Sequence, residues 1–472
     1  MSYALIDNSS LTAVQRLLGR VEVRGDHSVE GDIAAFQQLI HAILFYHEVV
    51  SIDDYKPEHR LSRANDFSFV RFVNPRELGL DKIEMMAADE AKKFMPEIRG
   101  GEFADEDFRQ FFEQLRMNIV CTWDISSSVY FLTMKMLGQP NTEEFEKYSA
   151  VSASIFTELN DRANRGGNWD ERVLLYDSTG LPIRDGYTVP NAKWGDGKSG
   201  GLTSGLKAFV AALNWLANRT IYYSLAARHL CADTFLHPIR GGFQIRYMQK
   251  TGVFGYNFTN ALLGSFDDRT QKTLAAIVSG ERELGLKLDL PLFSAWLVQQ
   301  TGNIQQVLET ALSLRNNEEF EAARYQILQI REAVEKDDIK TANAKAAKIS
   351  AGLDKLLQVV RKKYGLPSSP IGVPVNPVIK TFNTLASLKS LPELPEIDAR
   401  IPLPEFIQKA LTQRGIVQTY RNILDDLPTI WKLGDVRKKL TQAIRKSDEP
   451  AFTPKTEAPE FRHAHSQWKS PM

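Results

Sequence analysis

The stretch Tyr3–Gly19, YALIDNSSLTAVQRLLG, decides the fold. It begins with the short run YALI, which stops at Asp7, and this is typical of a short buried strand. The polar DNSS that follows supplies helix-capping side chains, and apolar residues then recur at helical spacing from Leu11 to Leu18, before Gly19. The stretch therefore predicts a strand that passes directly into a helix, which is the opening of an α/β unit.

The same alternation continues to about residue 78. Residues 32–48 carry apolar side chains at helical spacing, whereas VVSIDDY at 49–55 and FSFVRFV at 67–73 have the composition of strands. We therefore expect residues 1–78 to form a small N-terminal α/β unit.

Beyond this unit the pattern is mainly helical. Residues 79–316 are predicted to form a helical body. It is interrupted by a β-hairpin near 172–189, with a turn at Ser178-Thr179-Gly180, and by a long Gly/Ser loop at 190–205. The fold class expected for the whole chain is thus mainly α.

Residues 317–364 have the most regular spacing in the chain. Apolar residues recur at alternating intervals of three and four on both sides of a short polar KDD segment, and Asp338 is placed to cap the second helix. Two such stripes joined by a short connection predict an antiparallel helical hairpin with a coiled-coil seam. The hairpin is either plain architecture or an arm that docks a partner.

The C-terminal part has a different composition. Residues 365–447 are predicted to form a proline-rich extended segment, packed on a surface, followed by one or two basic helices. Residues 448–472 contain few aliphatic side chains, which predicts a disordered tail.

Composition narrows the class of protein. Among 472 residues, 58 basic side chains balance 58 acidic ones, which argues against a dedicated nucleic-acid coat or membrane-surface protein. The N-terminus lacks the pattern of a signal peptide, and the longest apolar stretch, 206–230, contains charged residues, so we expect no membrane insertion. Cys121 and Cys231 lie in apolar surroundings and are expected to be buried thiols of a cytoplasmic protein.

Aspartates mark the predicted sheet edge. Asp7 ends the first strand, Asp53 and Asp54 end the second, and Asp32 opens the helix between them. Carboxylates gathered at one edge could hold Mg²⁺ or Mn²⁺ through Asp7, Asp53 and Asp54, and a catalytic set of Asp7, Asp32 and Asp53 could activate water against a phosphodiester. The alternative is that these side chains only cap helices and form turns.

The opening YALIDNSS followed by a helix resembles the start of PIN-like nuclease domains, over about 50 residues. In that family an apolar strand ends in an aspartate and a small polar residue. The resemblance implies a metal-dependent nuclease with Mg²⁺ or Mn²⁺ as cofactor and nucleic acid as substrate, and its motif is short.

A second candidate site lies in CADTFLHPIRGGFQIR, residues 231–246. His237, Arg240 and Arg246 could form a clamp for a phosphate or nucleotide ligand, and Lys198 in the Gly/Ser loop could contact the same ligand. The alternative is a corner in which a helix ends, Pro238 enforces an extended backbone and a glycine pair lets the chain turn. The spacing of His and Cys here matches no common zinc pattern.

Three functions therefore follow from the sequence. The first is a cytoplasmic helical interaction or regulatory protein with a protein partner. The second is a metal-dependent PIN-like nuclease that uses the N-terminal aspartates. The third is a phosphate or nucleotide binder that uses His237 and Arg240. Neither a substrate nor an oligomeric state follows from the sequence, and the chain could be an enzyme or not.

Overall fold

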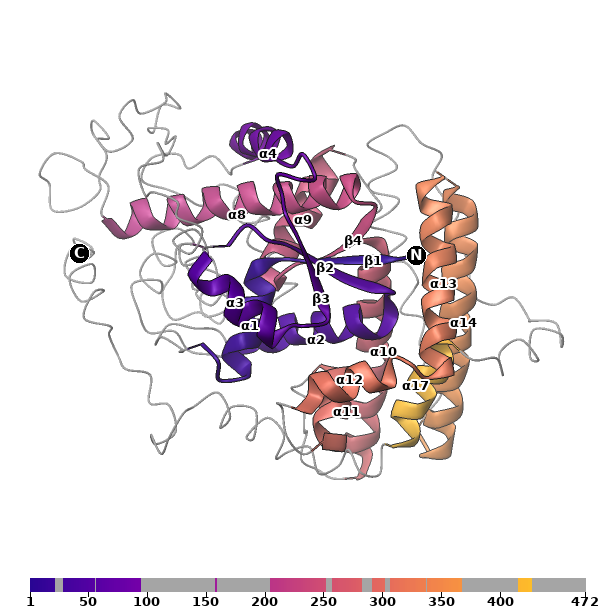
Figure 1. The fold of residues 1–472 in the computed structure, drawn as a ribbon. Coiled ribbons are helices and arrows are strands. Elements are labelled where there is room, and N and C mark those ends of the chain that lie inside the picture. The colour runs from indigo at the N-terminus through magenta and orange to yellow at the C-terminus, as the bar shows by residue number, and fades with distance from the viewer. Residues whose placement is uncertain are drawn as a thin grey trace, which may run out of the picture.

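A computed structural model gives the fold of the protein. It describes residues 1–21, 29–55, 57–94, 158, 204–251, 257–281, 291–301, 306–336, 338–366 and 415–426. This part of the chain is mainly helical and contains one small parallel sheet (Figure 1). The predicted β-hairpin near 172–189, the Gly/Ser loop up to residue 203, the proline-rich residues 367–404 and the C-terminal tail lie outside the described residues, whereas residues 204–205, predicted as loop, begin a helix.

The sheet has four parallel strands in the order β3-β2-β1-β4. Its strands are β1 (Tyr3–Ile6), β2 (Glu48–Ile52), β3 (Val70–Val73) and β4 (Ala232–Phe235). Strand β1 is central, and its residues 4–6 are fully buried, which is why its sequence is continuously apolar instead of alternating. The quoted opening stretch therefore forms the middle of the sheet.

Strand β4 shows that the predicted bounds of the N-terminal α/β unit, residues 1–78, are wrong. It comes from residues 232–235, far along the chain, so the sheet is not completed within residues 1–78. The sequence predicts only the end of a helix in this segment. The strand escaped detection because it is four residues long and contains Asp233 and Thr234, which are both buried.

Helices cover both sides of the sheet (Figure 1). The first group comprises α1 (Asn8–Leu17), α2 (Val29–Phe45) and α3 (Pro57–Asp66), and the second comprises α4 (Asp81–Phe94), α8 (Ser204–His229) and α9 (Pro238–Thr251). Helix α2 contacts β1, β2 and β4, while α8 packs on β4, α4 and α9. Among the helices that the structure describes, none combines the length and apolar composition needed to cross a bilayer.

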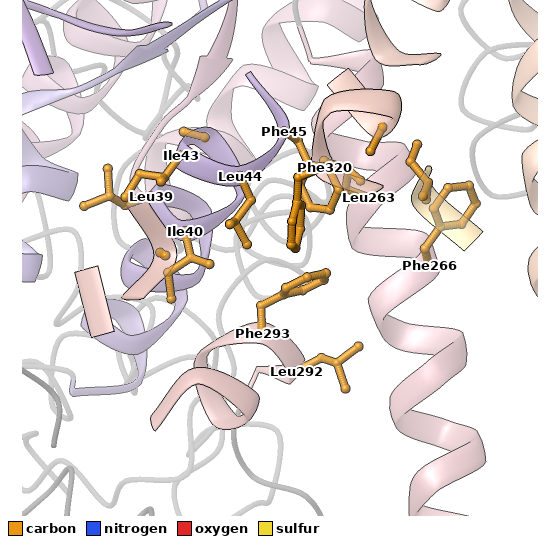
Figure 2. Close-up of a cluster of buried hydrophobic side chains, with 14 of the residues drawn as sticks. Leu39, Ile40, Ile43, Leu44, Phe45, Leu263, Phe266, Leu292, Phe293 and Phe320 are labelled. Carbon is orange, nitrogen blue, oxygen red and sulfur yellow. The ribbon is translucent and has the colours of Figure 1, made fainter. Parts of the chain in front are cut away.

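The remaining helices form an additional helical layer, which packs against α2. They are α10 (Phe258–Glu281), α11 (Leu292–Thr301), α12 (Val307–Leu314), α13 (Glu318–Glu335), α14 (Ile339–Lys363) and α17 (Ile416–Asp425). Aromatic rings join this layer to α2: the ring of Phe293 packs edge-to-face on Phe45, with centroids 5.5 Å apart (Figure 2). It also packs edge-to-face on Tyr420 at 5.5 Å. One continuous apolar core therefore runs from the sheet to α14.

The helices α13 and α14 lie side by side at the edge of the molecule (Figure 1). Asp338 caps α14 by accepting a hydrogen bond from the backbone N–H of Thr341, as its position predicted. The ring of Phe320 on α13 packs on Phe45 at 5.8 Å, and Arg269 on α10 pairs with Asp354 on α14. The pair is thus part of the common core, and the coiled-coil geometry of its seam stays a prediction.

The segment after α8 also differs from our prediction. Cys231 adopts a left-handed backbone with φ of 47° and is exposed, so it is not the buried thiol we expected, whereas Cys121 lies outside the described residues. Helix α9 then begins at Pro238, and the glycine pair 241–242 lies inside it. Proline suits the first helical position because its missing N–H is not needed there. The predicted open corner is therefore a strand and a new helix.

Candidate functional site at the carboxyl edge of the sheet

The carboxyl ends of β1 and β4 form a topological switch point. The chain leaves β1 toward β2 and β3 on one side, and it later returns to β4 on the other side of β1. In open parallel sheets this point leaves a crevice in which ligands commonly bind. Asp7 follows β1 directly, and His237 lies two residues after β4, so the two predicted sites meet at this edge.

Asp7 is fully buried and accepts three hydrogen bonds. Its Oδ1 accepts from the backbone N–H of Ser10 at 2.9 Å, which caps α1, and from the backbone N–H of His237 at 3.1 Å. Its Oδ2 accepts from Nη1 of Arg240 at 3.1 Å. The carboxylate thus joins the starts of α1 and α9 to the central strand.

Arg240 lies between two carboxylates. Besides Asp7, its guanidinium donates to both oxygens of Glu158, from Nε at 3.0 Å and from Nη2 at 2.7 Å. Arg240 is 0% exposed and Glu158 is 1% exposed. A guanidinium matches a carboxylate well in this side-on geometry, and the paired charges compensate for their loss of water.

A second buried network begins at Asn8, the next residue. The side-chain N–H groups of Asn8 donate to the carboxylate of Asp54 and to the hydroxyl of Tyr223, which is 3.2 Å away. Asp54 also accepts from Arg219 on α8 at 2.6 Å. Burial, and then the charge of Asp54, raise the pKa of Tyr223 well above its usual value, so its hydroxyl keeps its proton.

The other predicted acids have arginine partners of their own. Asp53 pairs with Arg60 at 3.0 Å, and burial raises the pKa of Asp53 although Arg60 opposes this effect. Asp32 on α2 is buried and pairs at 2.7 Å with Arg16, in the last turn of α1, whereas Asp7 caps the first turn of that helix. Helix α1, about 15 Å long, separates these two positions.

The structure therefore does not bring Asp7, Asp32 and Asp53 together as a catalytic set. Within the described ranges, no group of three or more His, Cys, Asp or Glu side chains is arranged to hold a metal ion. Asp54 points to Asn8 and Arg219, and Asp53 points to Arg60, so Asp7, Asp53 and Asp54 do not surround one position. The described acids of the edge instead face arginines.

The predicted anion clamp is also altered by the fold. His237 and Arg240 do lie together, but Arg240 is buried and its donors already bind two carboxylates. Arg246 is buried on the same helix, six residues further on, which places it about 120° around the axis from Arg240. Lys198 lies outside the described residues.

Several residues of this edge were missed in the sequence. Glu158, Arg219 and Tyr223 lie on segments predicted only as helix, with no motif around them. A buried arginine cannot be distinguished from a surface arginine by residue type alone. The one available signal was Arg219 within an otherwise apolar helix, since a charged residue there needs a buried partner.

A third buried carboxylate belongs to β4. Asp233 accepts a hydrogen bond from the hydroxyl of Tyr46 at 2.7 Å, and its side chain lies at the junction of the sheet with α13. Burial raises the pKa of Asp233 to about 6, although the charge of Arg331 on α13 and the Tyr46 hydrogen bond oppose the rise. Among the described residues, this carboxylate thus forms no direct ion pair, in contrast to Asp7.

Comparison with known proteins adds no relative to this description. No family model, no curated protein and no solved structure matches the chain.

Proposed function

We propose that the protein is an interaction or regulatory protein, in which the carboxyl edge of the sheet is a structural junction. The observation that carries this proposal is the pairing of the acids with arginines: Asp7 and Glu158 with Arg240, and Asp54 with Arg219. A carboxylate that is held by a buried guanidinium is not available to coordinate a metal or activate water. The same pairing keeps Arg240 from acting as a clamp for a ligand.

The surface proposed for the partner is a hollow on α13 and the start of α14. It has a volume of about 400 Å³, and its walls include Tyr325, Leu328, Glu332, Lys336 and Lys345. Tyr325 is 61% exposed. Exposed tyrosine beside apolar and charged groups is common at protein interfaces, where it gives a large contact area with a polar end.

The test uses point variants, because removal of residues 317–362 would expose the common core. Tyr325→Ser should abolish capture of a protein that the wild type binds reproducibly in cell extract. Val359→Ser is the matched control, since Val359 is equally exposed on α14 but does not line the hollow. Quantitative mass spectrometry compares the captured proteins. The same proteins captured by both variants at wild-type levels would contradict this use of the surface.

A second candidate function is metal-dependent cleavage of phosphodiesters. It is favoured by one observation: Asp7 and Glu158 bind the same guanidinium at the switch point. A divalent cation would have to displace Arg240 to use both carboxylates. Because this exchange requires movement of a buried side chain, the closed geometry favours the interaction role.

A thermal-shift series with Mn²⁺ and Mg²⁺, together with cleavage assays on labelled single-stranded DNA and RNA, separates these functions. The interaction role predicts no specific shift and no cleavage. A Mn²⁺ shift and a cleavage activity that are both lost in Glu158→Gln would instead support the nuclease. Asp89→Asn is an exposed control. If this variant also lost the Mn²⁺ shift and the cleavage, these would be attributed to surface carboxylates and not to Glu158.

A further inference from the structure

A small cavity lies beside the buried network, on the carboxyl side of β1 and β2. Its volume is about 90 Å³, and it is lined by Asn8, Asp53, Tyr55, Arg60, Arg63, Ala64 and Phe72. Two of the lining side chains are arginines from α3, and one is a carboxylate. The charged lining groups therefore carry one excess positive charge.

Arg63 brings this charge into the interior. It is 3% exposed, and its guanidinium lies over the ring of Tyr55 at 3.8 Å. Its Nη1 donates to the side-chain oxygen of Asn8 at 2.5 Å, and its Nη2 donates to Thr12 at 2.6 Å. These acceptors are neutral. In the described part of the chain, Arg63 forms no direct ion pair, and its Nε has no hydrogen-bond partner.

Buried arginines normally pair with an acid, because removing a charge from water is costly unless an opposite charge compensates it. Arg240 and Arg219 follow this rule at the same edge of the sheet. Arg63 departs from it. The carboxylate that lines the cavity, Asp53, pairs directly with Arg60, so the positive charge of Arg63 is only partly compensated there.

Arg60 supplies an accessible donor to the same cavity. Its side chain is 45% exposed, and its Nε binds Asp53 and the carbonyl oxygen of Tyr55. Its Nη1 donates to no acceptor within the described residues. The partly exposed Arg60 can thus contact a ligand directly, while the buried Arg63 attracts a negative charge electrostatically from the inner wall of the cavity.

The size of the cavity limits the ligand. A volume of about 90 Å³ corresponds to roughly three waters, each with about 30 Å³ of liquid volume. This space fits one compact oxyanion group but no nucleoside or peptide. Tetrahedral oxyanions such as phosphate also suit arginine donors.

We propose that this cavity binds a small oxyanion of the phosphate class, with Arg60 as the direct ligand and Arg63 as its buried counter-charge. Asp53 lines the same cavity and opposes the anion. The site lies outside the Asp7–Arg240–Glu158 network and does not depend on the partner role of α13.

Removing the charge of Arg60 and removing the charge of Asp53 should have opposite effects on the affinity for phosphate. Inorganic phosphate is titrated onto the full chain at constant ionic strength, with binding followed by calorimetry and by thermal shift. Wild-type protein should bind saturably. Arg60→Gln should weaken the affinity at least tenfold, since a charge-assisted hydrogen bond contributes about 1.5–3 kcal/mol and about 1.4 kcal/mol is tenfold. Asp53→Asn should strengthen the affinity severalfold.

Two comparisons make the result decisive. Arg71→Gln is the matched control, because Arg71 is a similarly exposed arginine on β3 that pairs with Glu48 and does not line the cavity. Its phosphate affinity should equal that of the wild type. Adenosine monophosphate in place of phosphate shows whether the group is carried by a larger molecule. No saturable binding, or equal affinities in all variants, would overturn the proposal.

Discussion

Asp7, directly after β1, and Asp233, within the neighbouring strand β4, are both buried, but they are stabilised in different ways. Asp7 accepts two backbone N–H groups and the guanidinium of Arg240, whereas Asp233 accepts a hydroxyl from Tyr46 and feels Arg331 only at longer range. Burial alone therefore does not decide how a carboxylate is stabilised. Its direct donors decide whether the cost of leaving water is offset.

Removing the guanidinium of Arg240, which pairs with Asp7, should have the largest effect on the free energy of unfolding. Arg240→Met leaves Asp7 and Glu158 buried without a counter-charge, so we expect the free energy of unfolding to fall by about 5 kcal/mol. Urea denaturation followed by circular dichroism measures this. Arg76→Met is the control, because Arg76 is exposed. A loss below about 1 kcal/mol for Arg240→Met would show that the two carboxylates do not depend on Arg240 for their stabilisation.

Truncation of a buried apolar side chain gives a stability loss with which this charge effect can be compared. Phe293→Ala removes a ring that contacts Phe45, Trp296 and Tyr420 in the common core, and it should destabilise the protein by about 4 kcal/mol. The same denaturation experiment applies. Met85→Ala, at an exposed position, should change the free energy of unfolding little. If the two variants behave alike, α11 does not belong to the cooperative core.

Neutralising Asp233 should stabilise the protein at neutral pH. Its pKa is about 6 in the folded state and near 3.8 when unfolded, so between these two pH values the folded protein holds a proton that the unfolded chain has lost. At higher pH the folded protein carries the buried charge, which destabilises it. The favourable contribution is complete below pH 3.8, and it is lost as the pH rises through about 6. At pH 8, Asp233→Asn should therefore gain about 2–3 kcal/mol, since each pKa unit corresponds to about 1.4 kcal/mol.

Stability measured from pH 4 to 8 provides the check. The wild type should lose stability relative to Asp233→Asn as the pH rises across this range, and the difference between them should then level off. Asp89→Asn is the exposed control and should follow the wild type. A difference that does not depend on pH would mean that Asp233 titrates at its ordinary pKa.

The smallest effect is expected at an exposed ion pair. Arg71 and Glu48 join β3 to β2, and their side chains are 54% and 33% exposed. Arg71→Gln should change the free energy of unfolding by less than about 1 kcal/mol, and raised salt should reduce the difference further. A larger loss would show that this pair is desolvated, as the Arg240 pairs are.

The local elements of the fold were predictable because their signals lie within a few residues. Strands β1, β2 and β3, the helices α1 and α2, the capping role of Asp7 and the cap at Asp338 all follow from short-range pattern and capping chemistry. The sequence does not predict strand β4 or the helix that begins at Pro238, because both depend on partners that lie far away in the chain.

The sequence by itself determined that the chain is mainly helical, that an apolar strand ends in Asp7, and that carboxylates and arginines are concentrated near two segments. Only the tertiary structure decided how they pair. It brought Arg240 from α9 to Asp7 and Glu158, placed Arg60, Arg63 and Asp53 around one small cavity, and merged α13 and α14 with the common core. The reason is physical: charge compensation acts over a few ångströms in space and leaves no fixed spacing in the chain.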